Sequence, residues 1–582
     1  MKEIFRTHTC NDLTISDLEK EVVISGFVSS IRDHGGVKFI DLKDNYGITQ
    51  IVVHDETVLK GISKESVIKV EGKVIKRDED TINEKIKTGL IEVELKKLTL
   101  LSKANLLPFE VEKSKEVKEE TRLKYRYLDM RNNKVNKNIK LRSEVLHFIR
   151  NKMYDLGFTE VQTPILTASS PEGARDFVVP SRLFKGNFYA LPQAPQIYKE
   201  LLMVGGFDKY FQIAPCFRDE DARSDRTLEF YQLDLEMSYV NEEDIIKVGE
   251  DVFYDIFTKF SSKEISPKPF RKISYKDSMN FYGTDKPDLR NPLVIKDASE
   301  VLKNTSFRPF KDSVIKVIVV DNIGDKSNSW FNEVVEYATK IGMPGIGYIT
   351  LMEDKSFKGP IDKFLTEEER ENLIKKFDMK TNSVMFFIAN KKLKTAQKFS
   401  GLIRTYLGEK LDLIDKNKLE LCIIKDFPMF EYDEKEKKYD FCHNPFSKPY
   451  DEFKEYDKFD LEDIIAHQFD FVCNGFEMSS GAVRNTDLDL ITKGFVKVGY
   501  KSDIIEKRFS SLFTAFKYGV PPHGGMAPGI DRILMLILDE SNLREVQAFP
   551  VNSSGVDQMM GSPSILEKKQ LDELGIKVVE ED

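Results

Sequence analysis

Residues 1–105 consist of short segments in which apolar and polar residues alternate, with turn signals between them. The segments are EVVISGFVSSIRD, GVKFIDLKD, GITQIVVHD, SVIKVEGKVIKRD and LIEVELKKLTLLS, and a short helical piece, ETVLKGISKES, lies between the third and the fourth. Alternation with a period of two predicts β-strands. Five strands with a helix at this place predict an OB-fold barrel, a fold that often holds single-stranded nucleic acid. Any other small β-barrel is the alternative.

The rest of the chain predicts a larger body with an insertion. Residues 106–140 form a polar, mostly basic linker with helical stretches, which is either a solvated hinge or a contact for a phosphate backbone. Apolar residues then recur at helical spacing up to Gly157, a C-cap residue. We therefore predict an α+β multidomain protein with the following parts: barrel 1–105, linker 106–140, a second domain split into 141–288 and 421–582, the latter with a C-terminal extension, and an inserted α/β, ferredoxin-like domain at 289–420.

The stretch CFRDEDARSDRTLEFYQLDLE, residues 216–236, places charged residues along predicted strands. Period-two alternation divides its second half into two faces: Tyr231, Leu233, Leu235 and Met237 on one, and Phe230, Gln232, Asp234 and Glu236 on the other. The upstream run YFQIAPCF alternates in the same way, so the two strands form a long hairpin. A solvated sheet face is the alternative. The mixture of small residues and isolated charges instead indicates the floor of a ligand site.

Two later segments offer groups that could bind a polyphosphate. Asp470 and Glu477 lie on strand-like segments, followed by small residues and Arg484. One or two carboxylates beside a polyphosphate suit Mg²⁺. Gly529 and Arg532 stand at the start of the helix IDRILMLILDE, where an arginine opposes the helix dipole and indicates an anionic partner, a surface salt bridge being the alternative. No GxxxxGK[ST] motif occurs, so arginines on an antiparallel sheet would have to hold a nucleoside triphosphate.

Composition restricts the class of protein but identifies no chemical site. A chain of 582 residues with 41% hydrophobic and 32% charged residues is an ordinary globular protein of two to four domains. Five scattered cysteines without a CxxC argue against zinc and disulfides and fit a reducing cytosol. No apolar run reaches the roughly 20 residues of a membrane span, and no signal peptide is evident. The net charge of −9 gives no indication of nucleic acid, so only local patches could bind it.

Several motifs together resemble one family. They are GFTEVQTPIL ending near Pro164, FRDED followed by Arg226 and EF, APGIDR at 527–532, SPEGARDF at 170–177 and QAPQIYKELLM at 193–203. On these motifs the chain resembles the bacterial-type aspartyl-tRNA synthetases, class II enzymes, over essentially its whole length. The resemblance implies an antiparallel-sheet class II catalytic domain, ATP and Mg²⁺ as cofactors, L-aspartate and tRNA(Asp) as substrates, a homodimer formed through the Pro164 segment, and a cytoplasmic protein that binds neither membrane nor DNA.

The resemblance also implies a role for each residue at a matching position. Arg218 would clamp the α-phosphate and the substrate carboxylate, Arg532 the γ-phosphate, and Phe230 would stack on adenine. The other ATP-binding residues would be Asp219, Glu220, Thr227, Glu477, Gly529, Ile530 and Asp531. Asp470 and Glu477 would hold Mg²⁺. The aspartate-binding residues would be Glu172, Gln196, Lys199, Arg218, Asp234, His443 and Arg484.

Specificity for aspartate depends on Lys199 and Arg484, which would bind its side-chain carboxylate; two structural ion pairs are the alternative. Neither a lysine-specific nor an asparagine-specific relative would need two cations there. FCHNPFS departs from the SFHHPF-like sequence of the family, with Asn444 after His443. A protein that only binds RNA would be expected to lose phosphate-binding groups, all of which are present.

For the barrel, the resemblance implies anticodon contacts from Arg32, Phe39 and Gln50, although Phe39 could instead be a core residue. In this family, histidine rather than leucine at the position of His34 accompanies tolerance of tRNA(Asn) as well as tRNA(Asp). Asp80 lies where glycine is frequent, which gives a mixed indication. We predict a non-discriminating enzyme, with a strictly discriminating one as the alternative.

Overall fold

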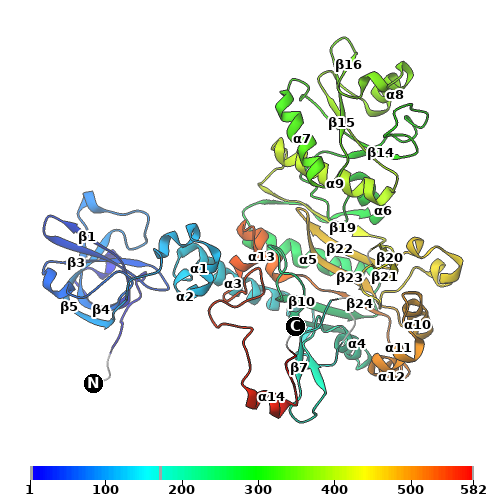
Figure 1. Ribbon diagram of the computed structural model, residues 1–582. Coiled ribbons are helices and arrows are strands. Elements are labelled where there is room, and N and C mark those ends of the chain that lie inside the picture. The colour runs from blue at the N-terminus through cyan, green and yellow to red at the C-terminus, as the bar shows by residue number, and fades with distance from the viewer. Residues whose placement is uncertain (1–3, 170–173, 435, 580–582) are drawn as a thin grey trace. The chain divides into compact units, whose positions relative to one another are not determined.

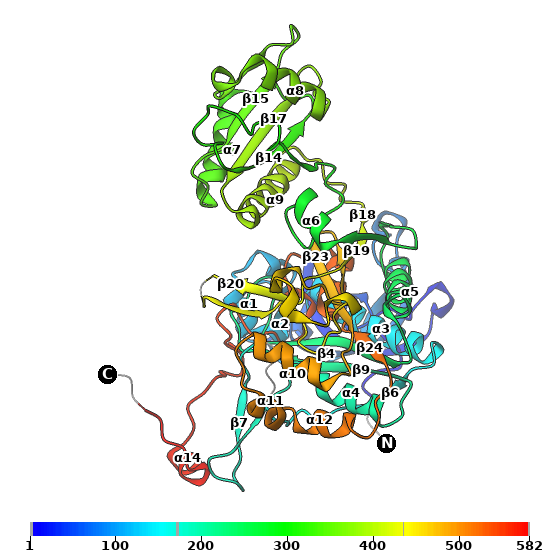
Figure 2. The same ribbon diagram turned by 90° about the vertical axis from the view of Figure 1, so that its right-hand side faces the viewer.

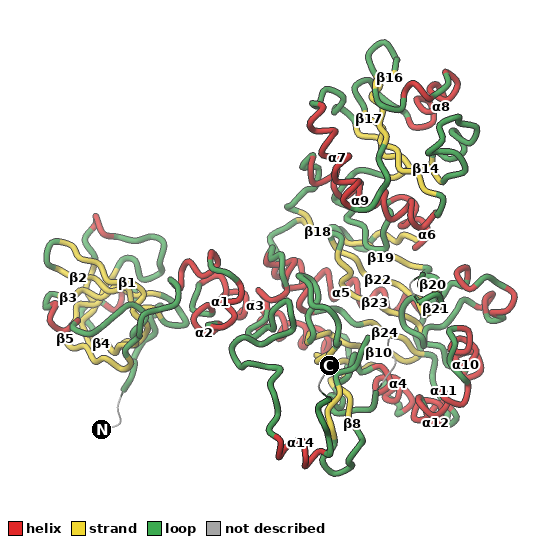
Figure 3. Tube along the Cα trace, in the orientation of Figure 1, coloured by secondary structure: helices red, strands yellow, loops and turns green. Residues whose placement is uncertain are grey.

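The computed structural model describes residues 4–169, 174–434 and 436–579, and the chain divides into one unit that ends at Val117 and another that begins at Lys118. The first unit is a closed barrel in the strand order β1-β2-β3-β5-β4, which confirms the predicted barrel. Its strands are β1 (Glu21–His34), β2 (Val37–Lys43), β3 (Ile48–Val53), β4 (Val67–Lys76) and β5 (Ile91–Ser102). Figure 3 shows the strands of this unit in yellow, joined by green loops.

The barrel forms because one side chain in two points inward. Along β1 the buried positions are Val22, Ile24 and Val28, and they pack against apolar residues of the other four strands. The predicted helical piece is shorter than expected: only Glu56–Leu59 is helical, as a 3-10 turn capped by the Asp55 side chain.

Residues 118–140 are not a linker in the structure. They form α1 (Glu119–Lys124), α2 (Arg126–Asp129) and the first part of α3 (Asn133–Asp155), which ends just before Gly157. Arg122 is buried and donates to Asp129 over 3.0 Å and to Glu545 over 2.8 Å. The charges that indicated a solvated hinge therefore face one another inside the second unit.

An eight-stranded, mostly antiparallel sheet is the centre of the second unit (Figure 1). Its strands, in spatial order, are β12 (Arg271–Ser274), β19 (Leu421–Lys425), β22 (Gln468–Cys473), β23 (Phe476–Val483), β24 (His523–Met526), β10 (Glu229–Ser238), β9 (Lys209–Phe217) and β6 (Thr159–Glu160). The predicted hairpin is confirmed, with Phe230 opposite Cys216 and Asp234 opposite Gln212 in β10 and β9.

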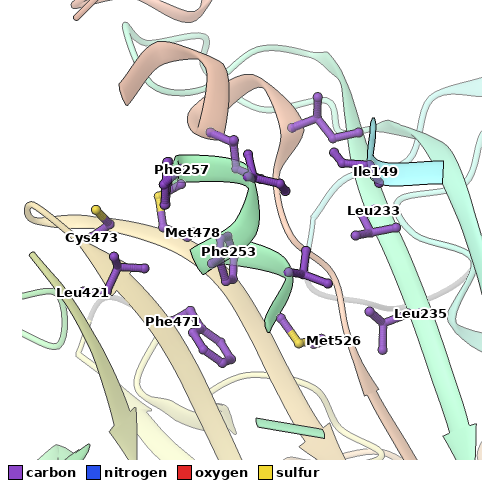
Figure 4. Packing of buried hydrophobic residues seen from close by; sticks show 14 of the residues in the cluster. Ile149, Leu233, Leu235, Phe253, Phe257, Leu421, Phe471, Cys473, Met478 and Met526 are labelled. Atoms are coloured by element: carbon purple, nitrogen blue, oxygen red, sulfur yellow. The ribbon is translucent and has the colours of Figure 1, made fainter. Parts of the chain in front are cut away.

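The apolar face of this sheet is covered by α3, α5 (Glu242–Phe260) and α13 (Ile530–Leu538). Figure 4 shows Phe253 and Phe257 of α5 among sheet residues that include Leu233 and Phe471. At Gly249 a Cβ atom would lie 2.5 Å from the Phe471 ring, so glycine permits this close packing. The apolar residues on β10 thus form the core, which leaves the polar side of the sheet for the site.

Further elements surround the sheet. They are β7 (Val178–Pro180), β8 (Phe188–Ala190), α4 (Gln196–Val204), β11 (Glu264–Ile265), β18 (Lys418–Leu419), β20 (Phe430–Asp433), β21 (Lys438–Phe441), α10 (Leu488–Lys497), α11 (Ser502–Arg508), α12 (Ser510–Phe516) and α14 (Lys568–Leu574). Figure 2 shows α4, α10, α11 and α12 close together. None of the helices in the described ranges has the length and hydropathy needed to cross a membrane.

The inserted domain is an antiparallel five-stranded sheet with helices on both faces. It comprises β13 (Ile295–Asp297), β14 (Val314–Val320), α7 (Asn328–Lys340), β15 (Gly347–Leu351), β16 (Phe357–Lys358), α8 (Glu367–Phe377), β17 (Val384–Asn390) and α9 (Leu393–Lys410). Helices α7 and α9 pack on one face, and α8 packs on the other.

One segment, residues 282–293, joins this insertion to the eight-stranded sheet; we call it the strap. It follows α6 (Tyr275–Phe281). Arg404 of α9 is buried and donates three hydrogen bonds of 2.6–3.0 Å to strap carbonyls, those of Asp288, Asn291 and Leu293. On its other side, the strap approaches the β22–β23 turn at Gly475, where a Cβ atom would lie 3.5 Å from Asp288. The insertion is therefore fixed to the strands that hold Asp470 and Glu477.

Candidate active site

A cavity of about 580 Å³ opens on the polar face of the sheet. It is lined by thirteen of the residues predicted for ATP, aspartate and metal binding: Gln196, Lys199, Arg218, Glu220, Thr227, Phe230, Asp234, His443, Glu477, Arg484, Gly529, Asp531 and Arg532. Three others do not line it, namely Asp219, Asp470 and Ile530. Glu172 lies outside the described residues.

Two buried cations line the cavity, and both are held by carboxylates of β10. Lys199 donates to Asp234 over 2.9 Å and lies 3.2 Å from Glu236. Arg484 donates to both oxygens of Glu236, over 2.8 and 3.1 Å. In the unliganded chain these cations therefore do form ion pairs, and a substrate carboxylate would have to share them with Glu236.

The two carboxylates of β10 differ in the direction of their pKa shifts and in how their oxygens are hydrogen-bonded. Although burial opposes it, the charges of Arg484 and Lys199 lower the pKa of Glu236 to about 2. Burial raises the pKa of Asp234, whose Oδ1 has no hydrogen-bond partner among the described residues. A buried acceptor without a donor is costly, so Asp234 is suited to receive a ligand N–H group.

Arg218 and Phe230 form the second region of the cavity. The guanidinium carbon of Arg218 lies 5.0 Å from the centre of the Phe230 ring. Within the part of the chain that the structure describes, the buried Nε of Arg218 has no hydrogen-bond partner. An arginine held on an aromatic ring without a carboxylate partner is prepared for an anion from outside the protein.

The loop between β9 and β10 closes this region. Glu220 accepts from Arg226 over 2.7 Å. Thr227 is buried and donates to the backbone carbonyl of Glu229 over 2.7 Å, so its hydroxyl is already used. The backbone N–H of Asp219 donates to the Arg175 carbonyl, and Asp219 does not line the cavity.

The start of α13 shows why a residue in a motif need not touch a ligand. The Ile530 side chain is completely buried in the hydrophobic core, so only its backbone could approach a nucleotide. Asp531 is buried, forms an ion pair with Arg142 and accepts from the backbone N–H of Tyr231 over 3.3 Å. Arg532, in contrast, keeps a partly exposed guanidinium whose carboxylate neighbours, Asp225 and Glu477, are 3.8 Å away.

Asp470 and Glu477 could both bind a cation, although their surroundings differ. Asp470 is 1% exposed, and neither carboxylate oxygen has a hydrogen-bond partner among the described residues. Burial raises the pKa of Asp470 to about 6. Glu477 lies 3.0 Å from Lys286, and this cation and Arg532 outweigh burial and lower the pKa of Glu477 to about 2. Two carboxylates, one without donors, match the limited protein ligation of Mg²⁺, and no cluster of three or more metal-binding side chains occurs among the described residues.

His443 and its neighbour occupy the side of the cavity nearest these groups. His443 Nδ1 lies 3.9 Å from Asp470, and its ring packs edge-on against Phe427. Asn444, the departure from the family pattern, donates to Gln196 over 2.9 Å. The asparagine therefore orients a residue predicted to bind aspartate.

Sequence reasoning missed four polar residues of this site: Glu200, Glu236, Lys286 and His523. Glu236 shares the polar face of β10 with Asp234, so the period-two pattern contained a signal for it. Lys286 lines the cavity from the strap, and Glu200 and His523 lie completely buried beside the cation pair. Nothing local in the sequence distinguishes these three from surface residues.

In the barrel unit, four predicted anticodon residues come together on β1, β2 and β3. Arg32 donates to Gln50 over 2.9 Å, and Phe39 lies opposite Arg32 in the β1–β2 register. Phe39 is partly exposed and outside the barrel core, and its ring packs edge-on against His34. Asp80 lies in the connection between β4 and β5, exposed.

Comparisons with known proteins agree with this arrangement. A family model described as tRNA synthetases class II (D, K and N) matches residues 118–553, and an OB-fold nucleic acid binding domain matches 22–101. A curated relative from Ehrlichia canis, named Aspartate--tRNA(Asp/Asn) ligase, is 50% identical over 587 residues, covering 99% of both chains. A relative of the same name from Rickettsia felis is 49% identical and covers 98% of both chains.

A solved structure shares the fold. Asparaginyl-tRNA synthetase from Pyrococcus horikoshii, complexed with asparaginyl-adenylate, superposes with a TM-score of 0.58 at 19% identity, over 94% of this chain and 98% of that one. At this identity the likeness supports the architecture alone.

Proposed function

This chain belongs to the class II tRNA synthetases (D, K and N), and we propose that it joins L-aspartate to tRNA(Asp) and tRNA(Asn) by way of aspartyl-adenylate. The observation that carries the proposal is the pair of buried cations, Lys199 and Arg484, in the lining of a cavity that Arg218 and Arg532 also line. The resemblance inferred from the motifs is confirmed by the family match and by the relatives' names.

Aspartate would lie with its side-chain carboxylate on Lys199 and Arg484. Both side chains are at most 4% exposed, so water competes little for them. Asp234 Oδ1, which has no hydrogen-bond partner among the described residues, is available to the α-amino group, and the Gln196 side-chain oxygen that Asn444 orients could accept a second hydrogen bond from it. A lysine side chain would meet two cations here, and a neutral asparagine amide would lack the negative charge that the two cations attract.

For activation, the α-carboxylate of aspartate would attack the α-phosphorus of ATP, forming a mixed anhydride while pyrophosphate leaves. Negative charge then develops on phosphoryl oxygens, and catalysis consists of positioning and electrostatic stabilisation. Arg218 faces the α-phosphate and Arg532 the outer phosphates, while Phe230 provides a flat surface for adenine. No covalent intermediate with the protein is involved.

The family also uses Mg²⁺, and here Asp470 and Glu477 would hold it. When bound, the ion would neutralise charge on the phosphates. Lys286 now lies 3.0 Å from Glu477 and would have to share that carboxylate with the metal.

Transfer to tRNA would follow by attack of the terminal ribose hydroxyl on the anhydride. For the anticodon, the partly exposed Phe39 ring offers base stacking worth roughly 1–3 kcal/mol, which a near-neutral barrel needs. The relatives' names include both tRNA(Asp) and tRNA(Asn), which favours the broader tRNA range over strict discrimination.

A homodimer is the expected assembly. Ile165 and Leu166, directly after Pro164, are 46% and 54% exposed, and Phe188 on the nearby β8 strand is 52% exposed. Large apolar side chains grouped on a surface are typical of a protein–protein interface. Sedimentation analysis of the full chain measures the assembly.

The proposed reaction is tested by ATP–pyrophosphate exchange and by charging of both tRNA transcripts. Exchange is expected to depend on aspartate and to be negligible with asparagine or lysine at the same concentration. Both tRNA(Asp) and tRNA(Asn) are expected to accept aspartate. Exchange driven by asparagine or lysine would contradict the substrate assignment, and no aspartylation of tRNA(Asn) would restrict the enzyme to one tRNA.

Replacing His34 by leucine is expected to lower kcat/KM for tRNA(Asn) about 10-fold relative to tRNA(Asp). His34 packs edge-on against Phe39, so the change alters the polar rim of the base-stacking surface without touching the barrel core. Aspartate-dependent exchange should stay as in the unmodified chain because the change lies in the barrel. An unchanged ratio between the two tRNAs would remove His34 from tRNA selection.

A further inference from the structure

Six ionisable side chains lie together beneath the proposed aspartate site, each at most 4% exposed. They are the acids Glu200, Asp234 and Glu236, and the basic residues Lys199, Arg484 and His523. Every acid lies within 3.3 Å of a basic group of this cluster. Unpaired buried charge is strongly unfavourable, so the total charge of the cluster matters for both folding and binding.

The hydrogen bonds of His523 define its protonation state. The ring is completely buried at the start of β24, and its Nδ1 lies 2.8 Å from the Pro521 carbonyl. A carbonyl only accepts, so Nδ1 carries a proton. The second nitrogen, Nε2, lies 3.3 Å from Glu200 Oε2. With Glu200 ionised, an acceptor faces each nitrogen, and the ring satisfies both contacts only as the imidazolium.

Protonated His523 also makes the cluster neutral. Three carboxylates carry three negative charges, while Lys199 and Arg484 carry only two positive ones. With His523 neutral, the cluster would hold one excess negative charge, in the place where the proposed substrate brings a carboxylate. With the imidazolium, that repulsion is absent.

Two contacts connect His523 to the residues that would touch aspartate. The backbone N–H of Arg484 donates to the His523 carbonyl over 2.9 Å. Glu200, which faces the ring, accepts from the Gln196 amide over 2.6 Å through its other oxygen. His523 itself does not line the cavity.

We propose that His523 is a positioning residue for amino-acid recognition, which as an imidazolium balances Glu200 and thereby lets Lys199 and Arg484 attract the substrate carboxylate. The inference rests on the proposed function and adds to it a residue outside the cavity. The charged groups that act on the ring are Glu200 from α4 and Glu236 from β10, while Arg484, directly after β23, contacts the His523 backbone.

The titration of His523 gives the expected sign of the pH dependence. Burial opposes the charged ring, but Glu200 and Glu236 outweigh it and raise the pKa of His523. The imidazolium therefore persists below that raised pKa and is lost as pH rises through it. The KM for aspartate should accordingly increase toward alkaline pH, while the KM for ATP changes less.

The test compares His523→Gln with a matched change in packing, Phe516→Leu, whose ring contacts His523 edge-on. The first removes the charge and should raise the KM for aspartate about 10-fold in ATP–pyrophosphate exchange, with the KM for ATP within about twofold. The second should leave both within about twofold. Equal KM values for aspartate in His523→Gln and the unmodified chain would overturn the inference.

A second change restores the charge balance. In the double variant His523→Gln/Glu200→Gln, one negative charge is removed as well, and the KM for aspartate should return toward that of the unmodified chain. A merely structural role would predict a further loss instead, and that result would refute the proposal. If the unmodified chain shows no aspartate-dependent exchange at all, the proposed function itself fails.

If His523→Gln does not fold, the single variant Glu200→Gln still tests whether His523 controls aspartate binding. Removing the carboxylate beside the ring should move the midpoint of the pH dependence of the aspartate KM to lower pH, with the substrate's own titration unchanged. An identical midpoint in the two proteins would exclude His523 as the titrating group.

Discussion

Replacing Arg218 by glutamine is expected to lower kcat/KM for ATP–pyrophosphate exchange by about 10²–10³-fold, the usual loss when one preorganised donor to a developing charge is removed. The guanidinium rests on Phe230 and its Nε is buried without a hydrogen-bond partner among the described residues. Such an arrangement costs folding free energy rather than providing it. The variant should therefore unfold at the same temperature as the unmodified chain or at a higher one.

Two measurements separate these effects. Thermal unfolding in the absence of ATP reports stability, and exchange kinetics report catalysis. Arg218→Lys is the matched control: it keeps a positive charge but loses the planar, two-pronged donor set, so it should recover only part of the activity. A large drop in unfolding temperature with Arg218→Gln would show that Arg218 supports the fold instead.

Replacing Arg484 by leucine is expected to raise the KM for aspartate by about 10²–10³-fold, a loss typical of truncating one partner of a buried, hydrogen-bonded charge pair. Arg484 is 4% exposed and holds Glu236 with two hydrogen bonds. Its removal leaves Glu236 with only Lys199, and the free energy of unfolding should fall by roughly 3 kcal/mol.

The double variant Glu236→Gln/Arg484→Leu distinguishes binding from stability. Without the carboxylate there is no uncompensated charge, so the stability should largely recover. The KM for aspartate should remain high, because the cation that meets the substrate is still missing. If aspartate binding recovered together with stability, Arg484 would act only as the counter-ion of Glu236.

Much of the fold was predictable from local pattern. Period-two alternation identified the β9–β10 hairpin with the correct faces, since Leu233 and Leu235 are in the core and Asp234 is not. The region 118–140 was not predictable in this way. Arg122 and Arg126 look like solvated charges in sequence, and their burial depends on Glu545 and the Ala548 carbonyl, more than 400 residues away.

The residues of the site also differ in whether local sequence pattern predicts them. The motifs predicted the residues that line the cavity, because alternation along the strands and the starts of helices place these side chains there. Whether a motif residue can bind a ligand depends on its tertiary contacts. Asp531 forms an ion pair with Arg142, whereas Arg218 Nε has no hydrogen-bond partner among the described residues. Glu200 and His523 gave no local signal, since their proximity arises only when α4 meets β24.

The attachment of the inserted domain has an evolutionary consequence. Arg404 holds strap carbonyls, and Gly408 leaves room for the Asn291 side chain, whose amide lies 2.2 Å from where a Cβ atom would stand. A change at one of these positions therefore alters the fit of the others. Substitutions at 291, 404 and 408 are expected to be inherited as a set, and an insertion taken from another lineage would have to bring its own strap.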